Sequence, residues 1–348
     1  MGRESRQANG VRGSRDGPAG PSSIAGLFGM RRVLDEIPPA SWAVVMGAGI
    51  VSIDLYSDHR RVLSAIMLWF AAGVWLVLGS RLAYRHDRFV REARSPAAFT
   101  GVAGTAVLGT RFALEDYHAA AAALLALSGV WWALLIVPVL RHWKTPTAGL
   151  SFVLSVATEG LAVMAATLAV SYRAGWLLTA AVAALVLGLA FYAFTAARFD
   201  LRELVTGHGD EWVAGGALAI SALAAARVTD AGGALAQFSE QHSALTTSTL
   251  VLWCLAMAWL PALVTAEVLR PRLGYDVRRW ATVFPLGMYA ACSFAAGQVT
   301  GITGITGFGR VWTWVAFTAS LFALAGLLRH GWPVLRSQHT GPATGDAR

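Results

Sequence analysis

Charged residues are scarce in this sequence: only 14% of its 348 residues are Asp, Glu, Lys or Arg, while 56% are hydrophobic and the mean hydropathy is +0.54. Soluble domains carry about 25% charged residues, so the composition predicts many membrane spans. Cysteine is also rare. Cys254 and Cys292 both fall in apolar segments, so we interpret them as small core residues and expect neither a disulfide framework nor a zinc site.

Other absences exclude several kinds of chemistry. All eight histidines fall in loops, tails or segment edges, whereas a haem-carrying bundle needs them within its helices. The sequence contains no HExxH, no GxSxG and no phosphate-binding glycine loop. We therefore expect no cofactor, no metal and no enzymatic activity. The net charge of +8 is spread over many loops, which disfavours nucleic-acid binding.

Long apolar segments are abundant. Crossing about 30 Å of hydrocarbon takes 17 or more mainly apolar residues, and ten segments satisfy this requirement. They are residues 38–56, 62–83, 97–113, 118–140, 149–170, 175–197, 212–229, 246–267, 280–297 and 311–331. The sequence thus predicts an all-α integral membrane protein with ten spans.

The basic residues predict the orientation of these spans. With both termini on one side, that side holds 22 of the 28 Lys and Arg residues. Such an asymmetry predicts cytoplasmic termini and an inner-membrane location. We expect a disordered cytoplasmic extension over residues 1–36, a transmembrane domain over 37–332 and a cytoplasmic tail over 333–348. Met30 is an alternative start of the protein.

The ten segments differ in composition in an alternating pattern. The odd-numbered segments contain nine leucines and the even-numbered ones 25. Odd segments are instead rich in small residues, which either mark tight helix packing or border a passage. The odd segments recur at every second helix and therefore run in the same direction. We predict five helical hairpins about an axis normal to the membrane, with the odd helices inside around a central pore.

Two residues of the ninth segment are candidates for a gate. Pro285 removes a backbone donor and clashes with the carbonyl of Ala281, so it predicts a bend suited to a cavity-lining helix. The adjacent Phe284 is either a packing residue or a ring that closes the passage by sterics and dewetting. Arg278 and Arg279 are either topology determinants or cations that concentrate anions at the cytoplasmic mouth.

Acidic residues are rare within the spans. Glu159 is central to the fifth segment, where a carboxylate costs about 2.5–3.5 kcal/mol on insertion scales. It is either a proton-coupling group or a hydrogen-bonded packing residue. Asp54 and Glu267 lie at span ends, and we expect them to be interfacial caps or loop partners. The candidates for the substrate path are Gly47, Gly49, Ser52, Gly104, Glu159, Gly216 and Thr282.

Three stretches resemble the tellurite-resistance/dicarboxylate transporter family, which includes the plant slow anion channels. Residues 46–52, MGAGIVS, are similar to the first-span motif MGTGIVS, with Ala48 in place of the usual threonine. Residues 280–286, WATVFPL, resemble the ninth-span pattern WAxxFPL, and residues 212–222 resemble the seventh span. The resemblance covers nearly all of residues 38–331.

This resemblance implies five hairpins around a pore, commonly in a homotrimer embedded in lipid. It assigns Phe284 to the ring that occludes the pore in the channel branch. It also implies small anions as cargo: C4-dicarboxylates such as malate, or sulfite, chloride or nitrate, with a tellurite-resistance phenotype. Two residues depart from the pattern: Arg279 replaces an aromatic of many members, and Glu159 adds a potential negative charge. The main hypothesis is an anion transporter or channel; the alternatives are a proton-coupled dicarboxylate carrier using Glu159 and a membrane enzyme or sensor.

Overall fold

The computed structural model describes residues 41–84, 93–203, 209, 211–270, 276 and 278–337, with side chains described to residue 329. In these ranges the chain forms helices joined by turns, with one isolated β-bridge between Thr147 and Phe199 and no strand. The predicted all-α class is confirmed. The predicted extension over residues 1–36 and the end of the predicted tail, residues 338–348, lie outside the described residues.

Five of the long helices have nearly all of their residues buried. They are rich in small residues and carry few leucines, as the odd-numbered segments do. These helices are α2 (Trp42–Ser57), α5 (Phe99–Ala113), α7 (Val153–Tyr172), α10 (Trp212–Ala234) and α12 (Arg279–Thr300). Short 3-10 turns lead into two of them: η2 (Pro96–Ala98) precedes α5, and η3 (Gly149–Phe152) precedes α7.

The other five long helices alternate with these and expose most of their side chains. They are α3 (Arg61–Tyr84), α6 (His118–Arg141), α8 (Gly175–Ala196), α11 (His242–Leu269) and α13 (Thr303–Ser337). Their exposed residues are large and apolar, for example Trp69 on α3, Trp176 on α8 and Phe322 on α13. Apolar surface of this extent is stable against lipid tails and not against water.

The two sets of helices differ sharply in burial. In their most apolar windows, α7 is 83% buried and α10 is 94% buried, whereas the five exposed helices are between 17% and 33% buried. Within the described residues, seven helices are long and apolar enough to cross a membrane, and α2 is a shorter apolar helix. The structure is therefore that of a multi-pass membrane protein. The predicted count of ten spans stays a prediction.

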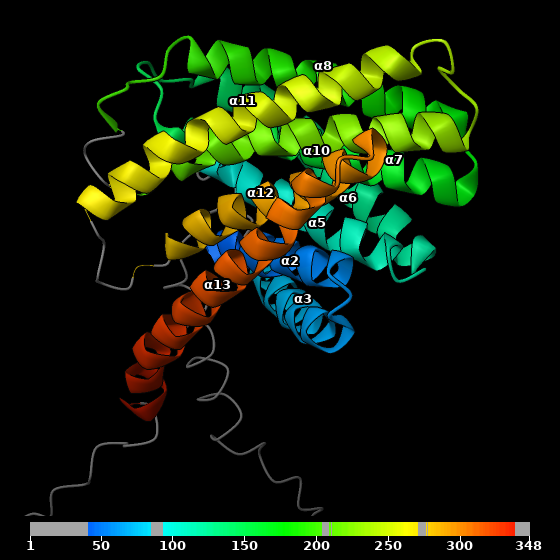
Figure 1. Ribbon diagram of the computed structural model, residues 1–348. Helices are drawn as coiled ribbons and strands as arrows, with labels where there is room; N and C mark the ends of the chain where they lie inside the picture. Colours follow the sequence, from blue (N-terminus) through cyan, green and yellow to red (C-terminus); the bar gives the residue numbers. More distant parts are fainter. Residues whose placement is uncertain are drawn as a thin grey trace, which may run out of the picture. The chain divides into compact units, whose positions relative to one another are not determined.

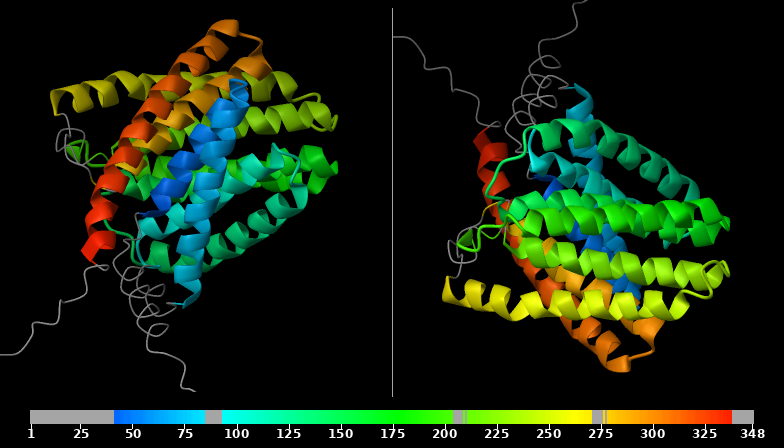
Figure 2. Two further views of the ribbon diagram at one scale, coloured as in Figure 1. Left: turned by 90° about the horizontal axis from the view of Figure 1, so that it is seen from below. Right: turned by 90° about the horizontal axis from the view of Figure 1, so that it is seen from above.

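The buried helices pack against one another in a closed sequence. α2 contacts α5, α5 contacts α7, α7 contacts α10, α10 contacts α12, and α12 returns to α2. Each buried helix also packs against the exposed helix that follows it in the chain (Figure 1). Figure 2 shows α13, coloured orange to red, running alongside α12 and past the blue α2. The small residues of the odd segments thus correspond to an inner layer, and the leucine-rich segments to an outer one.

Tryptophans of the outer layer tie it to the inner layer. Each of three indole N–H groups donates a hydrogen bond of 2.9 Å to a hydroxyl on the inner helix of the next helix pair. The pairs are Trp75 to Thr105, Trp132 to Thr158, and Trp253 to Ser293. This contact recurs at three of the five junctions between successive helix pairs, a regularity that the divergent sequence repeats do not reveal.

Helix ends depart from the predicted segments mainly at the C-terminus. α13 begins at Thr303, eight residues before the predicted start, and continues to Ser337, beyond the predicted boundary at residue 332. Gly304 and Gly307 lie in this early turn, and a side chain at either would meet open space. The prediction followed the continuous apolar segment, which begins at Val311, and therefore placed the start too late. α12 ends at Thr300, and the following residue, Gly301, has a φ of 70° that suits glycine just after a helix C-terminus.

Candidate functional site

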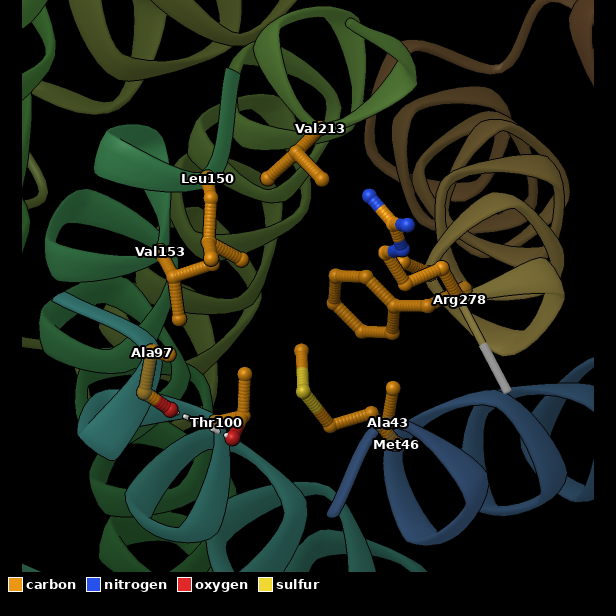
Figure 3. Close-up of a pocket in the computed structure, with 10 residues that line it drawn as sticks. Ala43, Met46, Ala97, Thr100, Leu150, Val153, Val213 and Arg278 are labelled. Carbon is orange, nitrogen blue, oxygen red and sulfur yellow. Dashed lines mark hydrogen bonds between the residues drawn. The ribbon is translucent and has the colours of Figure 1, made fainter. Parts of the chain in front are cut away.

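A cavity of about 60 Å³ lies where the five inner helices begin. Each of these helices, or the 3-10 turn that leads into it, contributes to its wall (Figure 3). The lining residues are Ala43, Met46, Ala97, Thr100, Leu150, Val153, Val213, Arg278, Ala281 and Phe284. The volume is room for a few water molecules, each of which needs about 10–15 Å³ of such space.

The wall of this cavity is apolar, but the backbone around it is polarised. Ala43 and Val213 are each the second residue of their helix, and Ala281 is the third. Helix N-termini carry partial positive charge from N–H groups without an intrahelical acceptor. Five parallel helices that start around one space therefore favour a negative charge there over a positive one.

Phe284 forms part of this wall and is 1% exposed. It follows Ala281 by one turn, so it lies deeper along α12 than the helix start. α12 continues through Pro285 without interruption. The Pro285 ring packs against Gly216 of α10, where an added Cβ would lie 2.9 Å from two ring carbons. The proline thus fixes the contact between two inner helices next to the candidate gate.

Arg278 is the charged residue among those lining the cavity. It caps the N-terminus of α12, and its Nε donates to Asp276 Oδ2 at 3.0 Å. Its side chain remains 47% exposed, and Figure 3 shows it extending toward Val213 at the cavity. Arg279 pairs instead with Glu267 of α11 at 3.9 Å, and the interfacial place of Glu267 stays a prediction.

Four glycines predicted to lie on the substrate path are found at contacts between neighbouring inner helices. A Cβ added at each would lie 2.8–3.3 Å from a facing side chain. The facing residues are Trp280 for Gly47, Val107 for Gly49, Val45 for Gly104 and Pro285 for Gly216. Helix packing, the alternative that the sequence left open, is what these contacts indicate.

Ser52, another predicted path residue, belongs to a buried polar cluster behind α2. Its hydroxyl donates to the Ser64 carbonyl at 2.7 Å and accepts from Arg111 Nε at 3.1 Å. Arg111 is fully buried, and its Nη2 donates to Ser64 and to Glu115 Oε1, at 2.8 and 2.6 Å. The cluster joins α2, α3 and α5.

Thr282, the last residue predicted to lie on the substrate path, is half-buried near the start of α12.

Glu159 lies away from the cavity wall. Its side chain packs against Gly188 of the outer helix α8, and its Oε1 accepts a hydrogen bond of 2.7 Å from Ser221 of α10. The carboxyl is therefore enclosed between α7, α8 and α10. This environment favours the packing interpretation of Glu159 over a place on the substrate path.

Asp54 corrects an expectation from the sequence. We expected an interfacial cap within reach of water, but the residue is 0% exposed. Neither carboxyl oxygen has a hydrogen-bond partner among the described residues. The expectation was wrong because α12 covers Asp54 at the last turn of α2, where Gly287 faces its carboxyl. A buried acid near a span end gives the same sequence signal as a cap.

A family model described as voltage-dependent anion channel matches residues 36–328. The chain belongs to this family. Members of the voltage-dependent anion channel family carry anions across membranes and are channels or transporters rather than enzymes. The resemblance inferred from three short motifs is thereby confirmed over nearly the whole predicted transmembrane domain.

Two relatives with curated sequences belong to Mycobacterium tuberculosis. Both are described as uncharacterised membrane proteins, one from strain CDC 1551 and one from strain H37Rv. Each is 29% identical over 130 residues, which is 34% of this chain and 62% of the relative. The alignment thus spans about three-fifths of the relatives' length, and their descriptions add membrane location but no substrate.

Proposed function

We propose that this member of the voltage-dependent anion channel family conducts small anions along the axis between its five inner helices. The observation that carries the proposal is the cavity at which all five inner helices begin. The proposed cargo comprises C4-dicarboxylates such as malate and the inorganic anions chloride, nitrate and sulfite. These anions share a negative charge and a small size, which are the properties that converging helix N-termini select.

Phe284 is the proposed gate of this path. Its ring closes the inner end of the cavity with an apolar surface, and an apolar constriction excludes water and ions by dewetting. The contact between Pro285 and Gly216 supports the role, because it anchors the backbone beside the ring. Opening then requires either a rotation of the ring or a shift of α12 against α10.

The cavity is proposed to open toward the cytoplasm. The termini and the arginine-rich connections lie at the start of the inner helices in the predicted topology, and cytoplasmic loops favour Lys and Arg. Arg278 at the mouth raises the local concentration of anions electrostatically. The proposed membrane is the inner membrane.

A flux assay across a panel of anions tests the proposal. The purified protein is reconstituted in liposomes, and uptake of malate, chloride, nitrate and sulfite is compared with that of a cation and with protein-free liposomes. We expect uptake of at least one anion and none of the cation. Equal leakage of anions and cations, or no anion uptake by the wild type or by a Phe284→Ala variant, would contradict anion conduction.

A further inference from the structure

The Asp54 carboxyl is the most poorly satisfied polar group on the inner layer. It is fully buried, and neither of its oxygens has a donor within the described parts of the chain. Glu159, another buried acid, differs because Ser221 donates to its Oε1, so that its Oε2 alone is without a partner among the described residues. A carboxylate without partners in an apolar interior is strongly disfavoured relative to the neutral acid. The resting structure therefore suits a protonated Asp54.

Asp54 lies on the face of α2 that leads away from the cavity. Met46, Ile50 and Asp54 are spaced four residues apart, which places them on one side of the helix. Met46 lines the cavity, and Asp54 follows about 12 Å farther along at 1.5 Å per residue. Because the inner helices start at the cavity, Asp54 lies deeper in the bundle than the cavity, at the contact between α2 and α12.

The contact across from Asp54 joins it to the candidate gate. Ile50 and Asp54 both face Gly287 of α12, which is three residues beyond Phe284. A Cβ added at Gly287 would lie 3.1 Å from Asp54 Oδ2. The absence of a side chain at Gly287 lets the carboxyl pack against the gate helix itself, one turn past the ring.

Charged groups on the neighbouring helices are engaged elsewhere. On α5, Arg111 binds Ser64 and Glu115, and on α3, Arg61 stacks on the Tyr56 ring. On α13, the Arg310 guanidinium lies 3.9 Å from Asp58. On α12, the titratable group facing Asp54 is the thiol of Cys292, which is also buried. Within the described residues, no ion pair includes Asp54.

We propose that Asp54 is a proton-binding site that controls anion passage. With the proton bound, the path past Gly287 is neutral and an anion crosses it. When the proton leaves to water in the path, the carboxylate repels an approaching anion through a low-dielectric interior. The proton is taken up from and returned to water, so no other reactant is required. This inference rests on the proposed anion conduction.

The test is the pH dependence of chloride and nitrate flux in liposomes, because these anions keep their charge across the range used. Wild-type flux is expected to fall as the pH rises, approaching a tenfold decrease per pH unit above the midpoint, as one titrating proton requires. Asp54→Asn, which is permanently neutral, is expected to keep the low-pH flux at every pH. Glu159→Gln is the matched control and is expected to keep the wild-type dependence. Replacing sodium by potassium in the buffer is expected to change nothing.

The outcomes separate the two proposals. Absence of anion flux in the wild type and in Phe284→Ala overturns anion conduction itself. Flux that occurs but does not change with pH, or a pH dependence that survives in Asp54→Asn or is lost in Glu159→Gln, overturns the role of Asp54 alone. Flux that requires sodium would indicate that Asp54 binds a metal cation and not a proton. This result also overturns the proposed role of Asp54.

A second measurement needs no variant. An apolar carbodiimide reacts with protonated carboxyl groups in apolar surroundings, and mass spectrometry of the wild-type protein locates the adduct. We expect modification of Asp54 together with loss of anion flux. An unmodified Asp54 under conditions in which flux is high contradicts the proposal even if Asp54→Asn fails to fold.

Discussion

At the scale of single residues, the polar groups in the inner layer fall into two kinds. Arg111 is held by several partners: the hydroxyls of Ser52 and Ser64, the Glu115 carboxylate and the face of the Tyr56 ring, whose centroid lies 4.2 Å from its Cζ. Asp54 has no hydrogen-bond donor within the described residues. The first arrangement stabilises one conformation, and the second leaves a buried carboxyl without a partner, which is the basis of the proposed proton-binding site.

Removing the Arg111 side chain tests its structural role. Arg111→Ala removes the donor of two buried serines, and a buried polar group left without its partner costs about 1–3 kcal/mol; Glu115 is 35% exposed and adds less. Arg60→Ala is the control, since its side chain is 56% exposed and surface ion pairs contribute about 0–1 kcal/mol. We expect a large decrease of the unfolding temperature in detergent for Arg111→Ala and a small one for Arg60→Ala. Equal decreases would contradict a structural role of the buried cluster.

The residue scale is also where the sequence was least informative. Arg111 and Asp54 are both near the ends of their apolar segments, where charged residues are common. The sequence does not reveal that a neighbouring helix buries each of them. The place of Glu159 in the fifth segment predicted that it is buried. The sequence did not predict that α8 encloses its side chain. Phe284 was singled out by Pro285 and by resemblance, and its position on the cavity wall agrees with that choice.

At the scale of helices, small residues set the distance between inner neighbours. Gly216 faces the rigid Pro285 ring at 2.9 Å, whereas Gly73 on the outer helix α3 faces open space. The Pro285 ring cannot rotate out of the way, so Gly216 requires the absence of a side chain.

Paired alanine substitutions test this difference. Gly216→Ala is expected to force α10 and α12 apart, at the cost of about 1–3 kcal/mol typical of overpacking. Gly73→Ala is expected to be neutral or stabilising by up to about 1 kcal/mol, because alanine is the better helix former. Unfolding temperatures of the two variants in detergent give the comparison. A Gly216→Ala protein as stable as Gly73→Ala would show that this contact is not tight.

The bond between Trp132 and Thr158 tests the link between layers. Trp132→Phe removes the indole donor and keeps most of the apolar area, so a loss of about 0.5–1.5 kcal/mol is expected. If the hydrogen bond is the cause, Trp132→Phe adds little in a Thr158→Val background. Full additivity in this double-mutant cycle would contradict the bond.

Helix types were predictable from composition, whereas helix boundaries were less so. The leucine and small-residue bias separated the exposed helices from the buried ones because lipid contact and close packing select different side chains. The start of α13 was missed since its glycines resemble a loop until the contact of Gly309 with Phe294 of α12 is known.

At the scale of the whole molecule, the apolar exterior surrounds an inner layer with few large side chains. Cys254 on α11 is exposed, and Cys292 on α12 is buried. A membrane-permeant maleimide is therefore expected to leave Cys292 unlabelled in the folded protein and to label both cysteines after denaturation. Mass spectrometry of the labelled peptides reads this out. Labelling of Cys292 in the folded protein would contradict the closed packing of the inner helices.

Assembly as a trimer stays a prediction that the resemblance implies.

The central claim is that anions cross between the inner helices at a point closed by Phe284. The most direct measurement compares chloride flux in liposomes for the wild type, Phe284→Ala and Phe152→Ala. Phe152 is also fully buried but is not one of the cavity-lining residues, because its ring packs against Tyr192 and Phe199. The account predicts a flux about tenfold or more above wild type for Phe284→Ala, equivalent to a barrier lower by about 1.4 kcal/mol, and no increase for Phe152→Ala. A Phe284→Ala flux no greater than wild type, or an equal increase in both variants, would contradict it.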